Sequence, residues 1–361
     1  MTAVAAPALA ASAADAGHTG DAGVVFVQTD NTAGNAVVAY HRAPDGTLTL
    51  AGTYPTGGLG GVLAGSVVDH LASQGSLTYD AGHGLLLAVN AGSDNVSVFG
   101  VLGDRLQLRQ VVWSGGRFPV SVTVHGNHAY VLDALDGGAL YGYRIRDGHL
   151  SPIPGSRRGL GLDPAATPQF TSTPGQAAFT PDGAAVIVTT KANGNDVDVF
   201  AVRPGGLLSA APVVNSVPGA VPFAISFDRA GHMLIAEAGP NALASFALSG
   251  GGTLRQLHVA LTGQAATCWV AGAGRYFYAS NAGSGSVSGY AIGGSGRLTA
   301  LGNTSTDAGT VDASAADGFL YVQTGAAGIV DEYAVSADGT LSAIGSVAVP
   351  GAVGGEGIVA L

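Results

Sequence analysis

Short runs of alternating hydrophobic and polar residues recur along the chain, and each repeat ends on an aromatic residue followed by a turn and a leucine. Alternation with a period of two predicts β-strands with one buried face. The aromatic residues recur at intervals of roughly 45 residues, with two longer intervals, which is the range typical of propeller blades. They are Tyr40, Phe99, Tyr143, Phe200, Phe246, Tyr290 and Tyr333.

The turns that follow these aromatic residues are rich in glycine. Asp45-Gly46 precedes Leu48, and Asp338-Gly339 precedes Leu341. Asp-Gly and Gly-Gly pairs between β-prone runs predict hairpins, because glycine tolerates the positive φ that tight turns need. The same pattern follows all seven aromatic residues, so the sequence predicts seven repeats.

One repeat shows how many strands each unit holds. Residues 121–124, 128–132 and 140–144 form three β-prone runs, and Leu150 opens a fourth. Seven units of four antiparallel strands predict an all-β fold, a seven-bladed β-propeller.

The two ends of the repeat array predict how the ring closes. Residues 24–27 form a second strand without a first, and residues 357–361 form a first strand without the rest of its repeat. We therefore expect the C-terminal strand to complete the N-terminal blade.

Composition narrows the classes of protein. Charged residues make up 11% of the chain, against roughly 25% in typical domains, which argues against helical bundles and coiled coils with their charged outer faces. A hydrophobic content of 47% supplies a core, and the net charge of −10 argues against a nucleic-acid partner. We expect a monomer acting on a small molecule.

Cysteine and histidine give no case for a disulfide, a metal or another cofactor. Cys268 is the one cysteine and lies in an apolar stretch, which predicts a buried core residue. His125 and His128 have the spacing of metal ligands, but they flank a predicted turn on the face opposite the long loops.

The first 16 residues are small and apolar, with Ala-x-Ala patterns such as Ala8-Leu9-Ala10. This pattern is typical of the end of a secretory signal and its cleavage site, although the first positive side chain is Arg42. We predict that residues 1–20 are a signal-peptide remnant or a disordered arm and that residues 21–361 form the propeller. Export to a secreted or extracytoplasmic location is the expectation, with a cytoplasmic location as the alternative. No apolar run approaches the roughly 20 residues of a membrane span.

Two segments resemble the propeller lactonase family, which includes 6-phosphogluconolactonases and carboxymuconate cyclases. They are residues 85–99 and the turn Phe179-Thr180-Pro181-Asp182-Gly183. The resemblance covers nearly the whole chain from about Val24 and implies the propeller fold. It also implies a catalytic Arg and His in a Gly-Pro-Arg-His signature, but Gly175 and Gln176 stand at those two positions. Thr190-Lys191 replaces the family's Asn-Glu, so the same chemistry is not expected here.

Two enlarged links, at about residues 54–74 and 155–176, emerge on one face and predict the side of the site. Polar residues at the ends of the second strands lie on that face: Thr29, Asn90, Asp133, Thr190, Glu237, Asn281 and Thr324. Such residues most often satisfy turns. Carboxylates are scarce in this chain, so Glu237 and Asp133 are predicted as the catalytic residues. The predicted substrate-binding residues at the channel mouth are Arg117, Gln176, Lys191, Asn90, Asn281, Gln74 and Glu356.

Two functions of different class remain open. The first is an exported lactonase-like enzyme that opens or forms a small cyclic ester. Glu237 would activate water, and Arg117 or Lys191 would stabilise the oxyanion. The second is a non-catalytic propeller that binds a small polar ligand or a protein partner through its loop-bearing face. Fold alone does not decide between them.

Overall fold

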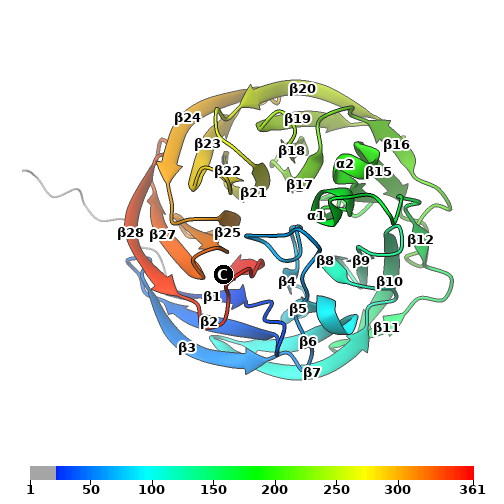
Figure 1. Ribbon diagram of the computed structural model, residues 1–361, viewed down its shortest axis with the longest axis horizontal. Helices are drawn as coiled ribbons and strands as arrows, with labels where there is room; N and C mark the ends of the chain where they lie inside the picture. Colours follow the sequence, from blue (N-terminus) through cyan, green and yellow to red (C-terminus); the bar gives the residue numbers. More distant parts are fainter. Residues whose placement is uncertain (1–21) are drawn as a thin grey trace, which may run out of the picture.

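The computed structural model describes residues 22–361, which form seven antiparallel sheets arranged as blades around a central axis (Figure 1). The all-β, seven-bladed β-propeller predicted from the repeats is confirmed. The proposed signal remnant or arm, residues 1–20, lies outside the described residues. The described helices are single turns, and none of them is long and apolar enough to cross a membrane.

The blades are numbered along the chain, and their strands are given from the axis outward. Blade 1 contains β29 (Ile358–Ala360), β1 (Gly23–Gln28), β2 (Ala36–Arg42) and β3 (Leu48–Pro55). Blade 2 contains β4 (Leu77–Asp80), β5 (Leu85–Asn90), β6 (Asn95–Leu102) and β7 (Arg105–Trp113). Blade 3 contains β8 (Pro119–His125), β9 (His128–Asp133), β10 (Ala139–Arg146) and β11 (His149–Pro152), with β12 (Arg158–Gly159) also paired to β10.

The second half of the ring repeats this arrangement. Blade 4 contains β13 (Ala177–Phe179), β14 (Ala185–Thr189), β15 (Asp196–Ala201) and β16 (Val213–Ser216). Blade 5 contains β17 (Pro222–Phe227), β18 (Met233–Glu237), β19 (Ala242–Leu248) and β20 (Leu254–Leu261). Blade 6 contains β21 (Thr267–Ala273), β22 (Tyr276–Asn281), β23 (Ser286–Ile292) and β24 (Leu298–Ser305). Blade 7 contains β25 (Thr310–Ala316), β26 (Phe319–Thr324), β27 (Ile329–Val335) and β28 (Leu341–Ala348). The helical turns are Ala91–Ser93, α1 (Gln169–Ser172) and α2 (Lys191–Gly194).

The seven repeating aromatic residues lie on the third strands and are buried between blades. Three of the tyrosines also bond to the blade before them. The hydroxyl groups of Tyr40, Tyr143 and Tyr333 donate to the carbonyl oxygens of Ala348, Trp113 and Ser305, at 2.8, 2.5 and 2.7 Å. Each of those carbonyls belongs to the last residue of an outer strand. These bonds fasten the outer edges of neighbouring blades.

The ring closes as the ends of the chain predicted. β29 pairs antiparallel with β1, with Val25 opposite Ala360 and Val27 opposite Ile358. The buried Arg42 guanidinium donates to the carbonyl oxygen of Leu361 at 3.2 Å. Blade 1 therefore combines strands from both ends of the described chain.

The long link between β3 and β4 crosses the mouth of the channel, and its blue trace reaches the centre of the ring in Figure 1. The Ser73 hydroxyl donates to the Val120 carbonyl of blade 3, and the Gln74 N–H donates to the Gly175 carbonyl beside blade 4. The His70 N–H donates to the Gly354 carbonyl, near the other end of the chain. This insertion, residues 56–76, thus fills the mouth that a plain propeller would leave open.

Candidate functional site

Five of the seven polar residues at the second-strand ends bond within the hairpin of their own blade. Asn90 and Asn281, predicted to bind substrate, donate to the Ser97 and Ser288 hydroxyls at 2.8 and 2.9 Å. The three threonines also bond within their hairpins: Thr29 to Ala36, Thr190 to Asp196 and Thr324 to Ile329. These five side chains are occupied in shaping the turns.

The two carboxylates of this set, Asp133 and Glu237, differ from the rest. Neither makes a hydrogen bond of normal geometry with a described residue. Burial raises the pKa of each to about 7. Both oxygens of Asp133 are buried without a partner, which costs free energy and calls for an explanation, whereas the Glu237 carboxylate lines an open cleft.

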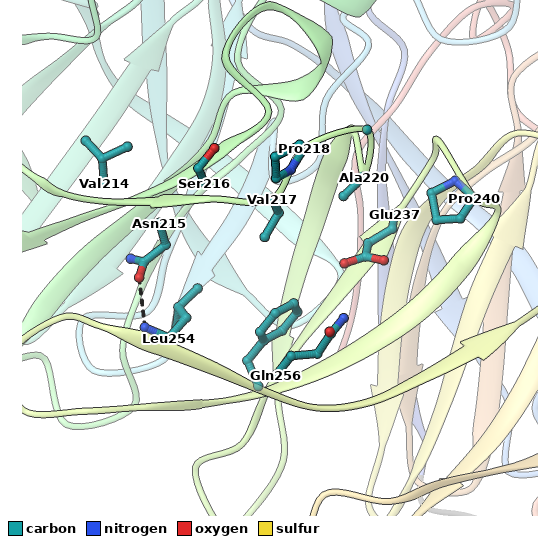
Figure 2. A pocket seen from close by; sticks show the side chains of 12 residues that line it. Val214, Asn215, Ser216, Val217, Pro218, Ala220, Glu237, Pro240, Leu254 and Gln256 are labelled. Carbon is teal, nitrogen blue, oxygen red and sulfur yellow. Dashed lines mark hydrogen bonds between the residues drawn. The ribbon is translucent and has the colours of Figure 1, made fainter.

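Glu237 lines a cleft of about 720 Å³ between blades 4 and 5, here called the interblade cleft (Figure 2). Met233 and Ile235 pack against blade 4, whereas Leu234 and Ala236 pack toward blade 6. Glu237 lies two residues after Ile235, so its side chain is on the same face of the strand as Met233 and Ile235 and points toward blade 4. The cleft is lined by Val214, Asn215, Ser216, Val217, Pro218, Gly219, Ala220, Glu237, Pro240, Phe246, Leu254 and Gln256.

The cleft lies at a junction where the tyrosine hydroxyl is missing. Phe246 is buried at the position of Tyr40, Tyr143 and Tyr333, but it has no hydroxyl to reach the end of β16. The tyrosine hydrogen bond that joins the outer strand of one blade to the next blade at those three junctions is therefore missing between blades 4 and 5. Phe99 and Phe200 also stand in place of tyrosine at this repeat position, so the exchange alone does not mark the cleft in the sequence.

Gln256 and Asn215 supply the two carboxamides of the cleft, and Ser216 adds a hydroxyl; sequence reasoning missed all three. The Asn215 carboxamide is occupied, since it donates to the Gly252 carbonyl at 2.9 Å and accepts from the Leu254 N–H at 2.8 Å. Gln256 pairs with Phe246 through the strand ladder, but its exposed side chain makes no hydrogen bond with another of the residues 22–361. Figure 2 shows its carboxamide and the Glu237 carboxylate on the same side of the cleft. A proton acceptor and an amide donor thus face the same space.

Asp133 lies in a different place. It ends β9 and faces blade 2, beneath Gly116, where a Cβ atom would come within 2.7 Å of the carboxylate. Both of its carboxylate oxygens are buried without a partner of normal geometry, and the nearby Ser114 hydroxyl offsets the raised pKa only in part. Asp133 and Glu237 therefore face two different junctions and do not converge.

The structure does not bring Asp133, Glu237, Arg117 and Gln176 together in one polar mouth. Side chains at the ends of second strands point toward the neighbouring blade, because successive residues of a strand alternate between its two faces. Arg117 is exposed and pairs with Asp136 at 3.2 Å. Gln176 is buried, and its side-chain oxygen accepts from the Ile225 N–H of blade 5 at 2.6 Å.

Gln74 and Glu356 do reach the mouth, where they hold the insertion. The Gln74 carboxamide bonds both the N–H and the carbonyl of Val270, each at 3.0 Å. The buried Glu356 carboxylate accepts from the Gly75 N–H at 3.1 Å, and burial together with neighbouring Asp312 raises its pKa. Both side chains are committed to the backbone of the protein itself.

Lys191 fastens both long links to blade 4. Its ammonium donates to the carbonyl oxygens of Ala72 and Phe170, each at 2.6 Å, and to the Thr173 hydroxyl at 3.1 Å. These three acceptors match the three N–H donors of an ammonium group. Burial lowers the pKa of Lys191 to about 7, and the Asp69 carboxylate opposes that shift. All three N–H groups of the ammonium donate to acceptors of the protein itself. Lys191 therefore has no free donor with which to stabilise an oxyanion, the role predicted for it from the sequence.

Gly175, which stands where the family signature has its arginine, has no room for a side chain. A Cβ atom on Gly175 would lie 2.9 Å from the Thr189 hydroxyl and 3.0 Å from the Phe223 carbonyl oxygen. An arginine side chain could not leave the backbone there without a local shift. Among residues 22–361 there is also no group of three or more His, Cys, Asp or Glu side chains placed to hold a metal ion.

Comparisons with known proteins agree with this architecture. A periplasmic gluconolactonase from Pseudomonas aeruginosa has a TM-score of 0.76 at 19% identity, covering 94% of this chain and 99% of that one. A protein from Lactobacillus plantarum has a TM-score of 0.75 at 20% identity, covering 94% and 100%. A candidate 6-phosphogluconolactonase from Bacteroides uniformis has a TM-score of 0.74 at 17% identity, covering 94% and 99%. At these identities the likeness shows the fold alone.

No curated protein sequence matches the chain. The profile of the family described as lactonase, 7-bladed beta-propeller, matches residues 62–355. That match spans most of the chain and agrees with the resemblance seen in its sequence. The chain belongs to the seven-bladed β-propeller lactonase family.

Proposed function

We propose that the protein hydrolyses a small cyclic ester in the interblade cleft, with Glu237 as the general base. The observation that carries this proposal is an unpartnered carboxylate with a pKa of about 7 in a cleft of about 720 Å³. A general base works best when its pKa lies near the operating pH. The volume falls within the roughly 300–1,000 Å³ of small-molecule sites.

The chemistry needs one proton to move twice. The Glu237 carboxylate accepts a proton from water while the water oxygen attacks the ester carbonyl carbon, and the carbonyl electron pair moves onto its oxygen. The Gln256 carboxamide N–H donates to that oxygen. When the intermediate collapses, the ring C–O bond breaks, and the ring oxygen takes the proton from Glu237. The products are an open hydroxy acid and the original carboxylate, and lactone formation is the reverse sequence.

A second candidate is a non-catalytic propeller that binds a small polar ligand in the same cleft. One observation favours it: the four signature positions hold Gly175, Gln176, Thr190 and Lys191, and Gln176 and Lys191 are occupied in holding the fold. Family membership alone therefore does not carry the activity over. The two candidates share a site and differ in whether product forms.

The test is a hydrolysis panel of sugar lactones and alkyl lactones on the purified protein, followed by acid release. Glu237→Gln is expected to lower turnover by about a hundredfold or more, the usual scale for a general base. Glu332→Gln is the matched control, because Glu332 is also a buried carboxylate with a pKa of about 7 but lies on blade 7. Full turnover by Glu237→Gln refutes the assignment. Lactone binding without turnover by the wild type selects the second candidate.

Export is a further part of the proposal. The Ala-x-Ala patterns of the first 16 residues support it, and the similar Pseudomonas aeruginosa protein is described as periplasmic. Intact-mass analysis of protein from its native host is expected to show loss of the Ala-rich segment. A mass that retains Met1 in exported protein contradicts cleavage.

A further inference from the structure

A second cavity, of about 150 Å³, lies on the channel-mouth face and is here called the mouth pocket. Val67, Val68 and Phe170 of the two long links form one side of it, and Ala238, Phe223 and Trp269 of blades 5 and 6 form the other. Val67 is 81% exposed, so the pocket has solvent at its edge. It is separate from the interblade cleft, and the surface that its lining residues expose to it is almost wholly apolar.

The polar groups around the mouth pocket are turned away from it. The Lys191 ammonium is satisfied by its three acceptors. The Asp69 carboxylate accepts from the N–H groups of Leu71 and Ser73 at 2.8 and 2.9 Å. The Trp269 indole N–H donates to the Ser73 carbonyl at 2.6 Å. A sugar or an ordered water would find no partner there, since buried polar groups need hydrogen bonds.

Aromatic side chains set the shape of the pocket. The rings of Phe223 and Trp269 meet edge to face, with centroids 5.1 Å apart, and the Lys191 ammonium lies 5.2 Å from the Phe223 centroid. An apolar cavity of about 150 Å³ is the size that holds benzene or xenon in another protein. Aromatic rings favour edge-to-face and offset contacts with a further ring.

We propose that the mouth pocket binds a small aromatic hydrocarbon ring, of the size of benzene or toluene. Consecutive residues divide it from the interblade cleft, since Ala220 and Glu237 line the cleft whereas Val221 and Ala238 line the pocket. A ring bound here does not need Glu237. The proposal therefore stands or falls independently of the hydrolysis proposed above. The ring can arrive as a free molecule or as a substituent of a lactone.

Trp269 supplies the readout. The chain has two tryptophans, and Trp113 is 60% exposed on an outer strand. In a Trp113→Phe background, toluene is expected to change the Trp269 emission saturably, with a dissociation constant of about 1 mM or below, whereas gluconolactone leaves it unchanged. A phenyl-substituted lactone that binds tighter than toluene shows that the ring arrives as a substituent, and equal affinity shows that the ring alone is recognised.

Filling the pocket is the decisive variant. Ala238→Leu in the same background is expected to weaken toluene binding at least tenfold. Ala230→Leu, on the exposed turn between β17 and β18 at the opposite face, is the matched control and keeps full affinity. Crystals of the wild type under xenon pressure give a second measurement, with a xenon atom expected beside Trp269. Absence of saturable binding together with an empty pocket under xenon overturns the proposal, as does unchanged affinity in a folded Ala238→Leu protein.

Discussion

Replacing Asp133 by asparagine is expected to stabilise the protein, and to do so only when the solution is neutral or alkaline. The variant keeps the shape of the side chain and removes its charge. Burial raises the pKa of Asp133 from 3.8 to about 7 in the folded protein. That difference corresponds to about 4 kcal/mol at most. We expect about 2–4 kcal/mol once partial solvation of the carboxylate is allowed for.

The sign follows from proton linkage. A carboxyl group with a raised pKa in the folded state adds stability that is fully present below pH 3.8 and is lost as the pH rises through about 7. The wild type therefore carries the cost of an ionised, buried Asp133 at pH 8, and the asparagine variant does not. Near pH 4 the two proteins are expected to differ little on this account.

Urea unfolding at pH 4 and pH 8 measures the effect. Asp133→Asn is expected to gain stability relative to the wild type at pH 8 and little at pH 4. Asn281→Ala is the control at the equivalent position of blade 6, where the side chain bonds its hairpin. That variant should lose about 1–3 kcal/mol at both pH values. A loss at pH 8 shows that the Asp133 carboxylate has a favourable partner, and a gain that is equal at the two pH values shows that the gain does not come from removing its charge. Either result refutes the reasoning.

Three further outcomes are expected. The rate of lactone turnover should rise as the pH passes about 7 and then become constant, because the ionised Glu237 carboxylate is the active form. A rate that falls over this pH range rules out Glu237 as the general base. Phe246→Tyr should add a hydrogen bond from the new hydroxyl toward the end of β16 and raise the free energy of unfolding, measured by thermal unfolding, by about 0.5–1.5 kcal/mol. It should also slow turnover, because the hydroxyl narrows the cleft. Tyr333→Phe on blade 7 is the control that removes such a bond. Lys191→Met should leave the carbonyls of Ala72 and Phe170 unpaired and cost about 3 kcal/mol. Limited proteolysis of the variant should then cut within residues 56–76. A cleavage pattern like that of the wild type contradicts the inference that Lys191 holds this insertion in place.

The fold could be predicted from the sequence because each repeat carries its own local signals. Tyr40 and its six counterparts mark the third strands, and the unpaired runs at residues 24–27 and 357–361 predicted the closure that β1 and β29 make. These signals depend on alternation and turn chemistry within a few residues. They need no knowledge of neighbouring blades.

The site was harder to predict because its residues act across blades. Gln74 bonds Val270 and Gln176 bonds Ile225, and neither pairing leaves a trace in local sequence. The path of residues 56–76 across the mouth decides that Lys191 holds backbone carbonyls instead of facing a ligand. Glu237 and Asp133 were singled out by the scarcity of carboxylates, and the structure separates them because side chains at these strand ends face adjoining blades.

The pairing of β29 with β1 has a consequence for biosynthesis. Gly23–Gln28 leaves the ribosome well before its partner Ile358–Ala360, because almost all of the described chain lies between the two strands. At about 5–20 residues per second, the apolar strand β1 waits roughly 20–60 seconds for its inner neighbour. During that time its free edge can pair with another chain, which is the usual route to aggregation. The nascent protein is therefore expected to depend on chaperones until β29 has been made, because the ring cannot close before then.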